Sequence, residues 1–138
     1  MKEETALRLL EGVLEARGAE WIAEGGYLRF SVRHGGMVWE TDCRPCENGM
    51  LIYARFPFRP EDRAAAERVC SEVNRGLVRG ALFLTEEGEL LYRCRAELDD
   101  VFGAEDRLEA ALEYSARVVT RYWGRLAAPE KSQPMKFT

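Results

Sequence analysis

The chain has 138 residues, of which 46% are hydrophobic, and this length suits a single domain with a buried core. Its formal net charge of -4 argues against general nucleic-acid binding, because a polyanion would meet no overall attraction. No apolar run is long enough to cross a membrane, and residues 1–5 lack the apolar segment of a signal peptide. We therefore expect a cytoplasmic protein without a membrane partner, in which the four cysteines are free thiols.

The chain begins with a helix and continues with strands. Residues 4–17 have helical apolar spacing, and Gly18 ends this first helix. A short strand is expected at residues 20–23. Residues 27–33 alternate between apolar and polar side chains, which is typical of a half-buried strand. The apolar stripe of the helix consists of Leu7, Leu10 and Leu14.

The pair Gly35-Gly36 predicts a tight hairpin. Two glycines can supply the positive φ angles of a two-residue turn, and such a turn fixes the pairing of its strands. It places Val32 opposite Trp39 and Arg29 opposite Asp42. This register is self-consistent, because apolar partners share one face and an opposite-charge pair occupies the other.

A third main strand is expected at residues 50–56, followed by a second helix. This helix opens at Pro60, because the missing N–H of proline suits the first helical position. Its apolar stripe consists of Ala66, Val69, Val73 and Leu77.

Two further strands are expected at residues 81–85 and 89–96, with a turn near Glu87-Gly88. A two-residue turn there would place Phe83 opposite Tyr92 and Leu84 opposite Leu91.

A third helix at residues 105–126 completes the predicted fold. Its apolar face consists of Leu108, Leu112, Ser115, Val119, Tyr122 and Leu126. The fold class is α+β, with an antiparallel sheet because short turns join neighbouring strands. Residues 1–126 form one domain, and we expect the polar tail at 127–138 to be disordered.

Both faces of the predicted sheet carry apolar residues. Two helices can cover one face, and the other needs the remaining helix, a partner subunit or a ligand. One face contains Phe30, Val32, Phe83, Tyr92 and Cys94. The other contains Leu51, Tyr53, Leu82, Leu84 and Leu91, which we predict to form a partner or dimer surface. We expect a homodimer in which the second helix and adjoining sheet residues meet their symmetry mates.

One stretch of the sequence indicates a helix end, a glycine stop and two strands joined by a tight turn. It covers residues 73–84, with the run Asn74-Arg75-Gly76-Leu77, and continues through residues 85–93. In this setting the chain resembles the YbjN family over about 7–126. These small bacterial proteins are labelled sensory transduction regulators and share the fold of type III secretion chaperones. The resemblance implies an α-β-β-β-α-β-β-α order and a binding module. Because the related chaperones dimerise, it also supports the homodimer. It transfers no catalytic residue and no cofactor.

Asn74 stands within the family-like run, but we expect a structural role for it. An asparagine side chain can bond exposed backbone groups near a helix end. This role is favoured over direct contact with a ligand.

The pattern Cys43-Arg44-Pro45-Cys46 is the one motif in the sequence that suggests redox or metal-binding chemistry. A Cys-x-x-Cys pair can act as a redox dithiol, but reactive pairs lie at a helix N-terminus and this pair is expected in a hairpin loop. Tetrahedral zinc would need a second closely spaced pair, which the sequence lacks. We therefore favour an unreactive loop with small buried cysteines, and expect no metal or other cofactor.

These observations favour a non-enzymatic protein-binding regulator or chaperone-like module, whose partner the sequence does not identify. One alternative is a small-molecule sensor with a pocket between the sheet and a helix, lined by Trp21, Trp39 or Tyr53. The other alternative is a redox or metal protein that uses Cys43 and Cys46.

Overall fold

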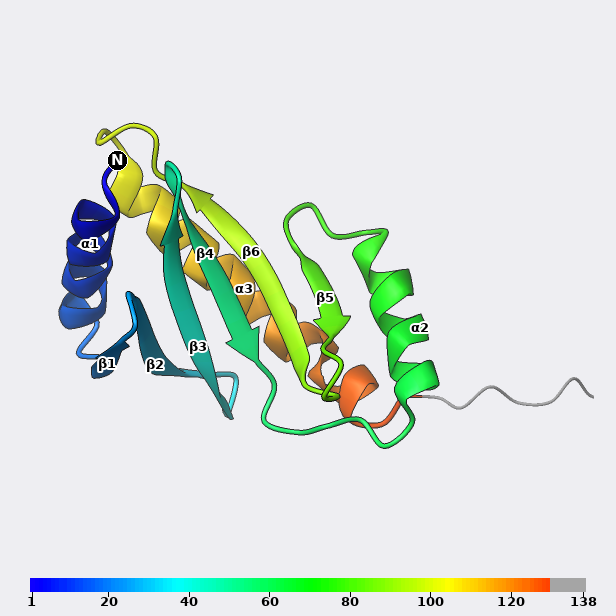
Figure 1. Cartoon of the computed structure of the whole chain (residues 1–138). Coiled ribbons are helices and arrows are strands. Elements are labelled where there is room, and N and C mark those ends of the chain that lie inside the picture. Colours follow the sequence, from blue (N-terminus) through cyan, green and yellow to red (C-terminus); the bar gives the residue numbers. More distant parts are fainter. Residues whose placement is uncertain (130–138) are drawn as a thin grey trace, which may run out of the picture.

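A six-stranded antiparallel sheet organises the computed structural model, which describes residues 1–129 (Figure 1). The elements in chain order are α1 (Glu3–Ala16), β1 (Trp21–Glu24), β2 (Tyr27–His34), β3 (Met37–Cys46), β4 (Gly49–Arg55), α2 (Arg63–Asn74), β5 (Ala81–Leu84), β6 (Leu90–Glu97) and α3 (Ala104–Ala127). The strand order in the sheet is β1-β2-β3-β4-β6-β5. This arrangement confirms the α+β class, the extra short strand and the long third helix. Most of the predicted tail, residues 130–138, lies outside the described residues.

The hairpin between β2 and β3 has the predicted register. Gly35 and Gly36 have φ angles of 58° and 77°, as a two-residue turn of this kind requires. Val32 pairs with Trp39, and Arg29 pairs with Asp42. The sequence therefore sufficed to assign the two faces of these strands.

The register between β5 and β6 differs from the prediction by one residue. Phe83 pairs with Leu91 instead of Tyr92, and Leu84 pairs with Leu90 instead of Leu91. The loop has three residues, 86–88, because Thr85 and Glu89 still pair through the Thr85 N–H and the Glu89 carbonyl at 2.9 Å. A one-residue slip moves each side chain of a strand to the opposite face.

All three helices lie on the same side of the sheet. Figure 1 shows α3 running diagonally behind the strands, with α1 near β1 to β3 and α2 beside β5. Both shorter helices also contact α3. One buried cluster joins the inner faces of the helices to one face of the sheet, including Leu10, Val73, Leu108, Ile52 and Tyr92. The expected division of the helices between two faces is therefore wrong.

Helix α2 is shorter than predicted at both ends. It begins at Arg63 rather than Pro60, because Asp62 acts as its N-cap and accepts a 3.0 Å hydrogen bond from the Ala65 N–H. It ends at Asn74, so Leu77 lies beyond it. By contrast, α1 ends as expected before Gly18, whose φ is 68°.

Candidate protein-binding surface

The sheet face opposite the helices carries three of the five residues predicted to form a binding surface. Leu51 and Tyr53 on β4 and Leu91 on β6 lie on this side, which we call the open face. The placement of Leu82 and Leu84 there is wrong. The register shift turns both toward the helices, and Leu82 is only 1% exposed. A binding role for the three remaining residues stays a prediction.

Cross-strand pairing arranges the open face in rows. The rows across β3, β4, β6 and β5 are Arg44–Leu51–Arg95, Asp42–Tyr53–Arg93 and Arg55–Leu91–Phe83. Leu51 therefore lies between two arginines, and Tyr53 and Leu91 each have one arginine beside them on a neighbouring strand. Tyrosine and arginine are the residue types that most often dominate protein interfaces. Sequence reasoning missed Phe83 as part of this face, since it depended on the wrong register.

A network of charged side chains fixes one half of the open face. Asp42 is 7% exposed and accepts hydrogen bonds from Arg29 Nε at 2.7 Å and Arg29 Nη2 at 3.2 Å. Arg55 Nη2 adds a third contact to Asp42 at 3.4 Å. The hydrogen bonds to Asp42 raise the pKa of Arg29, so this guanidinium remains charged. On this half of the face, Asp42 therefore links the guanidinium groups of Arg29 and Arg55.

Two other arginines of the open face form no ion pair with a described residue. Arg44 lies 4.4 Å above the ring of Tyr27, and Arg93 lies 5.8 Å from the ring of Phe83. Both arginines are exposed. Their charges are available beside the apolar side chains, so the open face suits a segment that combines apolar and acidic residues.

The two cysteines of the Cys-x-x-Cys pattern lie within β3, so their predicted loop position is wrong. Side chains alternate along a strand, and residues three apart therefore point to opposite faces. Cys43 is fully buried opposite Ile52, whereas the Cys46 sulfur lies 3.0 Å from Arg95 Nη1 on the open face. This geometry opposes a disulfide between the two. Within residues 1–129, no three metal-ligating side chains gather.

Thiol labelling tests the placement of the cysteines. Burial raises the pKa of Cys70 and Cys94 to about 11 and that of Cys43 well above its ordinary value. We expect a chromogenic aromatic disulfide to label Cys46 rapidly in the folded chain, and all four thiols only after denaturation. Cys46→Ser should remove the rapid phase. Rapid labelling of Cys43 would contradict its burial.

The three aromatic residues considered for a sensor pocket lie in different places. Trp39 lines a cavity between α1, the β2–β3 hairpin and α3. Trp21 borders a separate depression on β1 and β2, and Tyr53 lies on the open face. His34 and Ser115 also line the larger cavity. The apolar spacing of the third helix placed Ser115 on its inner face, but no sequence pattern indicates a cavity beside Ser115 or His34, because the cavity arises from helix packing.

Asn74 has the structural role expected for it, with a partner on β5. Its Nδ2 donates to the Leu82 carbonyl at 2.9 Å, and its Oδ1 accepts from the Leu82 N–H at 2.8 Å. The amide therefore takes the place of a neighbouring strand at the edge of the sheet.

Comparison with known proteins supports the fold. The chain is similar in structure to the Yersinia pestis type III secretion chaperone SycH, crystallised in complex with a stable fragment of YscM2. The sequences are 15% identical, the TM-score is 0.54, and the match covers 85% of this chain and 96% of that chain. This likeness confirms the predicted chaperone-like fold. No family model and no curated protein matches the chain. None of the helices within residues 1–129 has the length and apolarity needed to cross a membrane.

Proposed function

We propose that the chain is a non-enzymatic, chaperone-like protein-binding module of the YbjN type that holds a partner segment on its open face. The observation that carries this proposal is the apolar centre formed there by Leu51, Tyr53 and Leu91. SycH, which has a similar fold, was crystallised with a protein fragment, and this supports a protein as the partner. A cytoplasmic location and a role in sensory transduction are parts of the same proposal.

The chemistry of the open face defines the segment that would bind. Removal of apolar surface from water favours association. A segment lying across the strands would place apolar side chains on Leu51 and Tyr53. Its acidic side chains would meet Arg44 and Arg93, which have no ion-pair partner among the described residues.

A differential pull-down tests this proposal. The double variant Leu51→Arg/Tyr53→Arg adds charge to the centre of the open face and should lose partners that the wild type captures from the native cell. Val78→Arg is the matched control, because Val78 is 94% exposed in a loop outside this face. Mass spectrometry compares the three samples, and circular dichroism checks their folding. Retention of the same partners by the folded double variant would contradict the proposal.

The homodimer remains a prediction, with a different surface. Leu82 and Leu84 are turned inward, so the apolar residue of β5 that remains partly exposed on the open face is Phe83, which pairs with the buried Leu91. We expect sedimentation equilibrium at micromolar concentration to give the mass of two chains. Phe83→Glu should shift the equilibrium toward the monomer, whereas Val78→Glu should not. A monomeric wild type would count against the dimer.

A further inference from the structure

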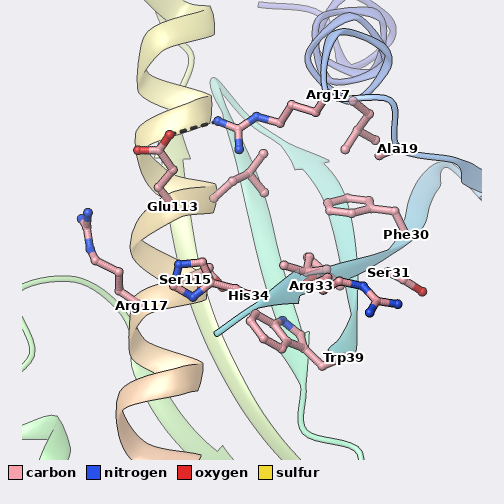
Figure 2. A pocket seen from close by; sticks show the side chains of 15 residues that line it. Arg17, Ala19, Phe30, Ser31, Arg33, His34, Trp39, Glu113, Ser115 and Arg117 are labelled. Atoms are coloured by element: carbon pink, nitrogen blue, oxygen red, sulfur yellow. Dashed lines mark hydrogen bonds and ion pairs between the residues drawn. The ribbon is translucent and has the colours of Figure 1, made fainter. Parts of the chain in front are cut away.

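A cavity of about 590 Å³ lies on the helix-covered side of the sheet and has no role in the proposed function. It lies between the end of α1, strands β2 and β3, and the middle of α3. Figure 2 shows Phe30 and Trp39 on its strand side and Ser115 on its α3 side. Its volume falls within the range of about 300–1,000 Å³ that is common for small-molecule sites. The larger apolar side chains of the lining are those of Leu14, Phe30, Val32, Trp39 and Leu112.

An ion pair links α1 to α3 beside this cavity. Arg17 Nη2 lies 3.0 Å from Glu113 Oε1 and 3.9 Å from Glu109, and Figure 2 shows the contact to Glu113 as a dashed line. The side chains of Arg17 and Glu113 are about half exposed. An incoming anion can therefore replace Glu113 at Arg17 while Glu113 turns to water.

One cation is placed to receive a ligand in this cavity. Arg33 and Arg117 also line it, but Figure 2 shows their guanidinium groups pointing away from Phe30 and Trp39. Arg17 extends from the end of α1 toward the cavity and toward Glu113 on α3. An anionic group in the cavity could therefore pair with Arg17.

Trp39 adds a donor without an acceptor. Its side chain lines the cavity, the residue is 2% exposed, and its Nε1–H has no hydrogen-bond partner among the described residues. An unpaired buried donor is unfavourable. An acceptor oxygen on a ligand in the cavity could pair with it.

We propose that this cavity binds a small aromatic anion. Its ring would pack against Phe30, Trp39 and Leu112, and a carboxylate or sulfonate group would bind Arg17 in place of Glu113. The cavity and the open face lie on opposite sides of the sheet. Failure of ligand binding in the cavity would therefore not contradict protein binding on the open face, and the converse also holds.

Two fluorescent probes that differ in one group provide the test. 8-Anilinonaphthalene-1-sulfonate is an aromatic anion, and N-phenyl-1-naphthylamine is its neutral analogue. We expect the anion to bind with saturation at one molecule per chain and about tenfold more tightly than the neutral probe. Arg17→Gln should abolish this preference, and Glu113→Gln should strengthen anion binding several-fold because it frees Arg17. Neither change should alter binding of the neutral probe.

Two further variants locate the site. Leu112→Trp should fill the cavity and prevent binding of both probes, whereas Arg93→Gln on the open face should leave both affinities unchanged. The absence of saturable anion binding would overturn the proposal. So would an anion affinity that is unaffected by Arg17→Gln and Glu113→Gln, or one that Arg93→Gln reduces. These surface charge variants should fold, since exposed ion pairs contribute little to stability.

Discussion

Replacing Gly80 by alanine is expected to reduce the free energy of unfolding by more than about 3 kcal/mol. Gly80 has a φ of 73°, a conformation that an L side chain adopts at a cost. A Cβ atom at this position would overlap the carbonyl oxygen of Arg93 and lie 2.8 Å from the Tyr92 hydroxyl. The Tyr92 ring is fully buried, and its hydroxyl donates to the Arg79 carbonyl at 2.6 Å. Neither neighbour can move without disturbing β6.

Urea unfolding followed by circular dichroism measures this effect, and the melting temperature should fall by about 10 °C or more. Gly12→Ala is the matched control, because Gly12 is exposed within α1 and an added Cβ meets nothing within 4 Å. That variant should stabilise the chain by about 0.5–1 kcal/mol. Equal stabilities for Gly80→Ala and the wild type would contradict the close approach of Gly80 to β6.

The two hairpins show what the sequence could and could not predict. Gly35-Gly36 permits a two-residue turn, and the resulting register placed Val32 and Trp39 on the correct face. Near Glu87-Gly88 the same reasoning failed, because a three-residue loop with glycine in its last position fits the sequence equally well. Each added loop residue reverses which side chains face the core. The prediction therefore assigned Leu82 to the open face and Phe83 to the helix-covered face, and both assignments are reversed in the structure.

The sequence also did not predict that all three helices lie on the same side of the sheet. Apolar residues on both faces of β4 suggested that both faces needed cover. In the structure Leu51 and Tyr53 are only partly exposed on the open face, although no helix covers them. Arg44 and Arg95 flank Leu51 and Arg93 is paired with Tyr53 in the sheet, and arginine side chains shield apolar surface with their aliphatic stems. Periodicity reveals a face of a strand, but not which neighbours cover it.

Replacing Asn74 by alanine should lower the free energy of unfolding by about 2–3 kcal/mol. The variant loses both hydrogen bonds to the backbone of Leu82, and it leaves the N–H and the carbonyl of this buried residue without partners. In addition, the amide proton of Leu82 should exchange with solvent faster than those of the central strands. Denaturant unfolding and hydrogen exchange by NMR measure the two effects.

Asn74→Asp separates this structural role from contact with a ligand. Aspartate can still accept from the Leu82 N–H, but its second oxygen would face the Leu82 carbonyl and repel it. We therefore expect a loss of stability at least as large as that of Asn74→Ala. Wild-type stability in both variants would instead favour a ligand role for Asn74. If the loss is observed, Asn74 occupies the outer hydrogen-bonding positions of β5 at Leu82, where an added strand would otherwise pair. A partner segment would then be excluded from this point of the edge, which favours the open face as its binding site.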